Sequence, residues 1–257
     1  MRFRNREMRR IPALLLTTAV LVLVGAAQAA ESDKVTVSLS AGKKIFEEGK
    51  EGVSPCQSCH GEKGLGIDAM QTPRLADVGY AYIVKQLTNF ADDARTDLTL
   101  GVMNLFAKQL TEEERRNVAA YLNSLPPASE PSDLAALKAG GTDVGEPYKG
   151  QILVKYGVLG KVPACQSCHG YNGRGSDPVY PAIGQQKYVY LVNQLKHWRD
   201  ATRANDPLGQ MRAVAKNLTD DDINNAAAYL SHAAKSTPGD GFLPNNQSVL
   251  GELNVVN

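Results

Sequence analysis

The sequence predicts an all-α protein built from two similar small domains in tandem. Aligned with itself, the chain repeats, so that Cys56 matches Cys165 and Tyr80 matches Tyr188, with a shift of one position between these two alignments. Within each copy, apolar residues recur at the spacing of one helical face, and no stretch shows the alternation typical of a sheet. Two copies of about 90 residues are too few for a solenoid, so we interpret the repeat as a duplicated domain.

Three helices are expected in each copy. In the first copy, residues 42–49 form a short helix that ends at a glycine, and residues 80–90 carry an apolar face at positions i, i+3, i+4 and i+7. The third helix begins with Thr111 and Glu114, a capping box, and its repeat opens at Thr219 with three aspartates.

A stretch rich in Pro, Ser, Ala and Gly, residues 126–141, is expected to be the linker between the copies. The two domains then occupy residues 30–125 and 142–235. The polar tail, residues 236–257, has no counterpart in the first copy, and the sequence leaves open whether it packs against a domain.

The six residues Cys-Gln-Ser-Cys-His-Gly occur twice and use every cysteine of the chain. Two cysteines separated by two residues and followed by a histidine are the attachment signature of a c-type haem. Each thiol adds to one vinyl group of the porphyrin, and the adjacent imidazole becomes an iron ligand. We therefore predict two covalently bound haem c groups, one on Cys56, Cys59 and His60 and the other on Cys165, Cys168 and His169.

A zinc site and a thioredoxin-like redox pair are the alternatives for a CxxC motif. A zinc site that combines all four cysteines gives no reason for the histidine after each pair. A redox pair is expected in a βαβ context, which the sequence lacks. No cysteine is left for a disulfide framework or a separate catalytic thiol.

Methionine, a second histidine or an open position can complete a haem iron that has one histidine ligand. Met103 and Met211 stand at the same repeat position, and each lies eight residues before the capping threonine of its third helix. Methionine is commonly a core residue, but this matched placement favours the sixth ligand. Met70 has no such partner and is assigned to packing or the surface.

The two other histidines of the chain, His197 and His232, have no histidine counterpart in the first copy. Surface or interface positions are expected for both, with an alternative sixth ligand as the competing interpretation.

The N-terminus predicts export. Five arginines within residues 1–10 precede an apolar run over residues 11–27 and an Ala-Gln-Ala site that ends at Ala29. This order is typical of a secretory signal peptide, so we predict that residues 1–29 are removed and that the protein is periplasmic. An uncleaved anchor is the alternative, but a run of about 17 residues is at the lower limit for spanning a bilayer. Haem attachment outside the cytoplasm agrees with export.

The near balance of 28 basic and 27 acidic residues predicts no nucleic-acid-binding face. The two halves nevertheless differ: residues 30–130 carry 11 basic and 15 acidic side chains, and residues 131–257 carry 12 and 11. Our hypothesis is that the halves dock different redox proteins, one that delivers electrons and one that receives them.

The paired CxxCH motifs, the Tyr-x-Tyr-x-x-x-Gln-Leu helix, the methionine before Leu-Thr and the closing Ala-Ala-Tyr-Leu helix together resemble the dihaem cytochrome c4 family, over residues 38–235. The resemblance implies two class I cytochrome c folds, each wrapped around a haem with His/Met ligation. It also implies that the carbonyl groups of Pro73 and Pro181 fix the proximal histidines, which would set ring orientation and ligand basicity.

One departure from the family concerns its usual Leu-Ala-Gly-Gln after that proline. The chain has Leu-Ala-Asp-Val from Leu75 and Ile-Gly-Gln-Gln from Ile183. We expect this difference to affect the exposure or potential of the first haem, and not its ligation.

Two closed irons leave no open site, so we expect transfer of single electrons between redox proteins, such as a respiratory complex, a terminal oxidase or a dehydrogenase. One alternative is a dihaem cytochrome subunit of a dehydrogenase complex, such as a sulfide-oxidising flavocytochrome. Another is a catalytic dihaem enzyme, such as a peroxidase or thiosulfate dehydrogenase, which would need an open or unusual ligand at one iron. Peripheral membrane association is left open.

Overall fold

The computed structural model describes residues 34–125, 130–234 and 253–256. The predicted signal peptide, residues 126–129 of the expected linker and most of the expected tail therefore lie outside the described residues.

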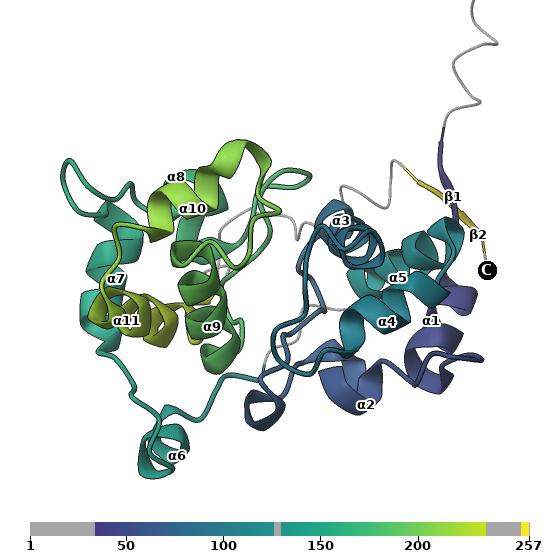
Figure 1. Ribbon diagram of the computed structural model, residues 1–257, viewed down its shortest axis with the longest axis horizontal. Coiled ribbons are helices and arrows are strands. Elements are labelled where there is room, and N and C mark those ends of the chain that lie inside the picture. Colours follow the sequence, from purple (N-terminus) through teal and green to yellow (C-terminus); the bar gives the residue numbers. More distant parts are fainter. Residues whose placement is uncertain (1–33, 126–129, 235–252, 257) are drawn as a thin grey trace, which may run out of the picture. The chain divides into compact units, whose positions relative to one another are not determined.

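Nearly all regular structure in these residues is helical, as predicted (Figure 1). The first half contains β1 (Thr36–Ser38), α1 (Leu39–Glu48), α2 (Gln57–His60), the 3-10 turns η1 (Glu62–Gly64) and η2 (Asp68–Met70), α3 (Tyr80–Ala91), α4 (Val102–Gln109) and α5 (Glu112–Ser124). The remainder contains α6 (Leu134–Ala139), α7 (Pro147–Tyr156), α8 (Gln166–His169), η3 (Tyr171–Gly173), α9 (Tyr188–Arg199), η4 (Pro207–Gly209), α10 (Gln210–Ala215), α11 (Asp220–Leu230) and β2 (Asn254–Val256).

The helices of the second half repeat those of the first in the same order. Helix α1 packs against α5, and its counterpart α7 packs against α11; in the same way α3 and α9 each contact the last helix of their half. The duplicated helical domain expected from the sequence is confirmed.

Local sequence signals set the helix boundaries. The hydroxyl of Thr111 accepts from the backbone N–H of Glu114, and Thr219 makes the same bond with Asp222, so both capping boxes are formed. Helix α1 begins at Leu39, earlier than the sequence predicts, because the side chain of Ser38 caps it by accepting from the N–H of Ala41.

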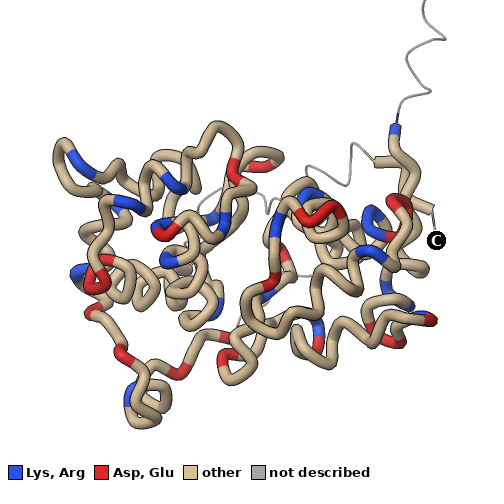
Figure 2. The backbone as a smooth tube through the Cα atoms, viewed as in Figure 1, with Lys and Arg blue, Asp and Glu red and all other residues tan. Residues whose placement is uncertain are grey.

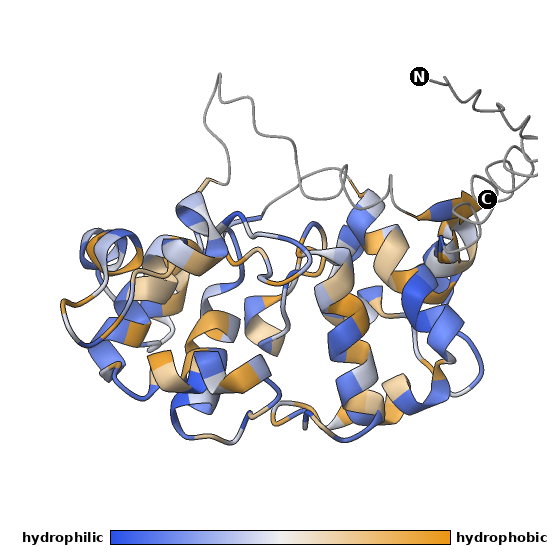
Figure 3. Ribbon diagram, turned by 90° about the horizontal axis from the view of Figure 1, so that it is seen from above, coloured by the Kyte–Doolittle hydropathy of each residue, from blue (hydrophilic) through white to orange (hydrophobic). Residues whose placement is uncertain are grey.

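Each half buries its own apolar cluster. Figure 3 shows hydrophobic residues (orange) alternating with hydrophilic ones (blue) along the helices of both halves. In the first half the predicted apolar faces of α3 and α5 turn inward, with Ile83 and Leu122 buried. In the second half the cluster is centred on α9 and α11 and includes Trp198. Residues of both clusters, among them these three, also border the cavity described below.

Several features were not predicted from the sequence: the helices α2, α4, α8 and α10, a pair of strands, and a helix in the linker. Strands β1 and β2 pair in parallel, with Val37 opposite Val255, so the last described residues of the tail return to the first half. Three-residue strands are too short to show an alternating pattern. Helix α6 lies within the expected linker and is capped by the side chain of Asp133. No helix among the described residues has the length and apolar character needed to cross a bilayer.

Candidate cofactor site

Each CxxCH motif forms a single helical turn. The backbone N–H of His60 donates to the carbonyl of Cys56 at 3.0 Å, and Gly61, with φ of 78°, ends the turn. The same bond joins His169 to Cys165. Because the turn is closed, both thiols and the imidazole of each motif are presented from one short element. None of the four cysteines takes part in a disulfide.

Both motif histidines are held by a proline carbonyl. Nδ1 of His60 lies 3.1 Å from the carbonyl oxygen of Pro73, and Nδ1 of His169 lies 2.9 Å from that of Pro181. A carbonyl can only accept, so Nδ1 of each ring carries the proton. The lone pair of Nε2 is then available for a metal, which is the arrangement that the resemblance implies.

Burial keeps these groups neutral. His60 and His169 are nearly inaccessible, and burial lowers the pKa of each ring, opposed by the hydrogen bond to the proline carbonyl. Burial also raises the pKa of the Cys56 and Cys165 thiols to about 11. A neutral imidazole is the form that ligates iron.

A cavity of about 640 Å³ joins the two motifs. Its wall is predominantly apolar, as expected for a pocket that receives a porphyrin. Every predicted haem-binding residue borders it: Cys56, Cys59, His60, Met103, Cys165, Cys168, His169, Met211, Pro73 and Pro181.

The two methionines lie at corresponding points of the wall. Met103 is in the first turn of α4 and Met211 in the first turn of α10. An aspartate fixes each helix start: Asp97 Oδ2 accepts from the N–H of Met103 at 3.2 Å, and Asp206 Oδ2 accepts from the N–H of Arg212 at 3.0 Å.

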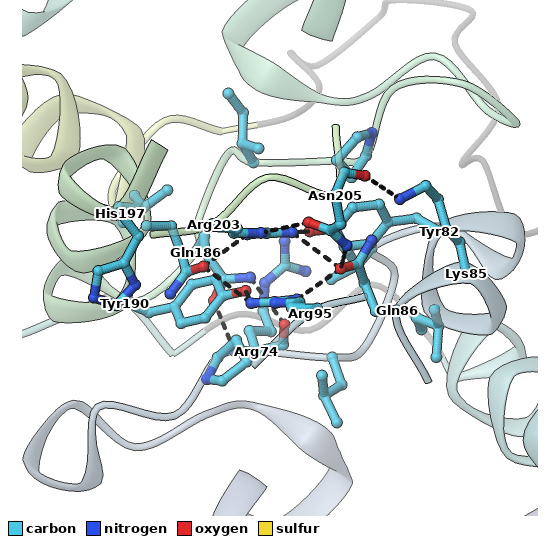
Figure 4. A pocket seen from close by; sticks show the side chains of 18 of the residues that line it. Arg74, Tyr82, Lys85, Gln86, Arg95, Gln186, Tyr190, His197, Arg203 and Asn205 are labelled. Carbon is cyan, nitrogen blue, oxygen red and sulfur yellow. Dashed lines mark hydrogen bonds between the residues drawn. The ribbon is translucent and has the colours of Figure 1, made fainter. Parts of the chain in front are cut away.

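The other methionine and the two other histidines differ in their position relative to the cavity. Met70 does not border the cavity. His232 is exposed and contacts Ser231, in line with a surface position. His197 is partly buried on α9 and lines the cavity, which places it closer to the site than a surface histidine would be (Figure 4).

Two buried arginines form a polar cluster in the same cavity, which was not predicted from the sequence (Figure 4). Arg95 donates to Gln86 at 2.8 Å within its own half, and to Tyr190 at 3.1 Å and Gln194 at 2.9 Å in the other. Its repeat partner Arg203 makes the mirror set of bonds. The full set is Arg95, Gln86 and Tyr82 from the first half and Arg203, Gln194 and Tyr190 from the second.

The members of this cluster stand at matching positions of the two copies, so the repeat is the one feature of the sequence that could have pointed to them. Nothing in that repeat, however, indicates that Arg95 and Arg203 are buried. Each guanidinium also lies over an aromatic ring of its own half, Phe90 at 4.6 Å and Trp198 at 4.1 Å. Among the described residues no carboxylate forms a salt bridge with either arginine.

The donor set fits a covalently held haem better than a bare metal ion. No group of three His, Cys, Asp or Glu side chains in the described parts of the chain is placed to hold a metal. The apolar wall suits a porphyrin ring, the two cysteine pairs suit thioether bonds, and the buried guanidinium groups of Arg95 and Arg203 suit its carboxylates.

Comparison with known proteins agrees with this geometry. A family model described as cytochrome c matches residues 39–126 and 162–234. A cytochrome c4 of Thiocapsa roseopersicina is 33% identical over 68% of this chain and 85% of that protein. The chain belongs to the dihaem cytochrome c4 family. It therefore carries two covalently bound haem c groups, and the names of its relatives agree with electron transfer rather than catalysis.

Three further proteins extend the comparison of this cytochrome. A protein of Stutzerimonas stutzeri named thiosulfate dehydrogenase electron acceptor is 32% identical over 90% of this chain and 100% of its own length. The structure of a reduced cytochrome c4 from Pseudomonas stutzeri matches with a TM-score of 0.62 and 28% identity, covering 76% of this chain and 97% of that one. The structure of a thiosulfate dehydrogenase from Marichromatium purpuratum matches with a TM-score of 0.68 and 30% identity. The match covers 78% of this chain but only 41% of that one.

Proposed function

We propose that this cytochrome is a periplasmic carrier that takes single electrons from a dehydrogenase and passes them to a respiratory acceptor. The first haem is held by Cys56 and Cys59, with His60 and Met103 as axial ligands. The second is held by Cys165 and Cys168, with His169 and Met211. The observation that carries this assignment is the shared cavity, which all eight side chains border at matched repeat positions.

The haem supplies a one-electron Fe(III)/Fe(II) couple when bound. The protein contributes a neutral histidine of fixed orientation, an apolar wall that excludes water, and buried cations in the same cavity. Two His/Met sites have no position left for a substrate, which favours a carrier over a catalyst.

Thiosulfate dehydrogenase is the donor that the comparisons favour. Two of the relatives are named as its electron acceptors, from Stutzerimonas stutzeri and Thiomonas intermedia, and the first of them is matched over its whole length. These names favour it over the sulfide-oxidising flavocytochrome that the sequence alone left as an alternative.

The surfaces of the two halves support separate docking of donor and acceptor. Tyr148 and Tyr156 on α7 are 72% and 76% exposed, and Leu159 beyond the helix is fully exposed. The repeat positions of the two tyrosines on α1 are Ser40 and Glu48. Figure 2 shows charges of both signs on each half, so the apolar residues of α7 are a sharper difference than net charge. Exposed apolar side chains of this kind are typical of protein-binding surfaces.

Stopped-flow reduction tests the donor. The holoprotein is mixed with a thiosulfate dehydrogenase and thiosulfate, and absorbance of the reduced haems is followed. We expect rapid reduction of both haems that depends on enzyme and thiosulfate together. Absence of reduction, while dithionite still reduces both haems, would reject this donor and leave the carrier assignment intact.

Docking is tested by substitution on one half at a time. In the Tyr148→Ser/Tyr156→Glu variant, α7 carries at these two positions the residues that α1 has. Charge reversal at Lys43 and Glu47 alters α1 instead. Each change is expected to slow exchange with one redox partner only. Equal slowing with both partners would contradict separate docking.

A further inference from the structure

The peptide group between Pro73 and Arg74 is hydrogen-bonded at both polar atoms. Its carbonyl oxygen lies 3.1 Å from Nδ1 of His60. Its N–H donates to Oε1 of Gln186, in the other half of the chain, at 2.6 Å. Gln186 and Arg74 are only 4% and 1% exposed, so water does not compete for these bonds. A continuous hydrogen-bond chain therefore runs from Gln186 through one peptide group to His60.

Gln186 also restrains this segment by further contacts. Its Nε2 donates to the carbonyl of Arg74 at 2.9 Å, so the side-chain amide pairs with both backbone groups of that residue. The guanidinium of Arg74 in turn donates to the carbonyl of Gly184 at 2.9 Å. Figure 4 labels Arg74 and Gln186 in the cavity wall. Three hydrogen bonds between the halves thus hold Arg74 and the peptide group that precedes it.

The second half has a similar series of hydrogen bonds, but its acceptor from the other half is a main-chain carbonyl. The N–H of Ala182 donates to the carbonyl of Val78 at 3.0 Å, and the carbonyl of that peptide, on Pro181, faces Nδ1 of His169. Val78 stands at the repeat position of Gln186 in the first copy. A side-chain amide therefore accepts this hydrogen bond only in the contact that the second half makes with the first.

Hydrogen bonds in series polarise one another in a buried site. An acceptor on the N–H of Arg74 makes the carbonyl of Pro73 a stronger acceptor, which gives the His60 ring more imidazolate character and a more basic Nε2. A more basic axial ligand favours ferric over ferrous iron and lowers the reduction potential.

We infer that Gln186 is a positioning residue for the first haem, which sets the orientation and basicity of His60 from the opposite half. The reduction potential of the first haem then depends on contact between the halves through one side chain. This inference rests on the proposed assignment of His60 as the axial ligand.

Three variants of the holoprotein test it, with the potential of each haem measured by redox titration followed by NMR of the haem methyl groups. Gln186→Leu is expected to raise the midpoint potential of the first haem more than that of the second, and to move the Nδ1–H resonance of reduced His60 upfield. Gln186→Glu keeps an acceptor for the Arg74 N–H, so the potential of the first haem should lie at or below that of the unaltered protein. Val78→Ala, the matched control for a change of buried volume, keeps its carbonyl acceptor, so it should shift neither potential as far as Gln186→Leu shifts that of the first haem.

The outcomes separate the inference from the ligand assignment. Iron-dependent shifts of the His60 ring protons establish ligation in the unaltered protein, and their absence would reject both. With ligation established, an unmoved first-haem potential in Gln186→Leu rejects the inference alone. Equal shifts of both haems, or an equal shift in Val78→Ala, would assign the effect to interface packing and likewise reject it.

Discussion

Gly150 of α7 lies directly against the main chain of Asn225 in α11: a Cβ at position 150 would come within 1.8 Å of the Asn225 carbonyl oxygen. The same approach occurs in the first half, where a Cβ on Gly42 would lie 2.0 Å from the carbonyl oxygen of Asn117. Contacts this short leave no room for any side chain. The first and last helices of each half can therefore cross only at glycine.

Gly150→Ala is expected to reduce the free energy of unfolding by at least ~2 kcal/mol, because the backbones of α7 and α11 must move apart. Chemical denaturation of the holoprotein measures the change. Gly140→Ala is the control, since its Cβ would meet carbonyl oxygens at an ordinary 3.4 Å. A similar loss in both variants would show that the helix crossing is not the cause.

Met103→His and Met211→His are each expected to lower the potential of one haem, because a second imidazole stabilises ferric iron relative to a thioether. Each should also remove half of the weak far-red absorption of the Met-ligated ferric protein. Redox titration and absorption spectra measure both effects. Met70→Leu, at a methionine away from the cavity, should change neither.

Arg203→Met removes one of the two guanidinium groups of the buried polar cluster while keeping an apolar stem. We expect the reduction potential of at least one haem to fall. Loss of a nearby positive charge favours the ferric state, which carries one more positive charge than the ferrous state. The variant should also unfold at lower denaturant concentration, because buried acceptors on Gln86 and Gln194 lose a donor. Lys108→Met, at a lysine side chain 45% exposed, is the control and should leave potentials unchanged.

Acidification is expected to weaken the anchoring of α5. Burial raises the pKa of Glu114, but hydrogen bonds from Lys50, 2.7 Å away, and from Thr111 outweigh it and lower the pKa below 4.5. The stabilisation is therefore complete above about pH 4.5 and is lost as pH falls through the folded-state pKa. Glu114→Gln should cost up to ~1 kcal/mol at pH 7 and progressively less below pH 4.5. Chemical denaturation over a range of pH measures the difference in free energy of unfolding between Glu114→Gln and the unaltered protein, and a difference independent of pH would refute this. Glu113→Gln, in the same turn, is the control and should show little effect at any pH.

Local pattern was sufficient for the three helices expected in each half and for the haem-attachment motifs that border the cavity. The capping boxes at Thr111 and Thr219 depend on side chains three residues apart, so the chain within one turn specifies them. The CxxCH spacing likewise determines a closed turn between Cys56 and His60. Duplication added Met103 and Met211, because a side chain repeated at one position is constrained in both copies.

Contacts between the halves could not be predicted in this way. Arg74 and Gln186 are 112 residues apart, and Arg95 and Tyr190 are 95 apart, with no short-range pattern that connects either pair. An arginine in a polar loop ordinarily faces water, and here only the packing of one half against the other removes that water. The sequence by itself determined two haem-binding helical domains and predicted their proximal histidines. Tertiary structure decided which charges are buried beside the cavity and that Gln186 of one half hydrogen-bonds to the segment that holds His60 in the other, because burial depends on surfaces far apart in the chain.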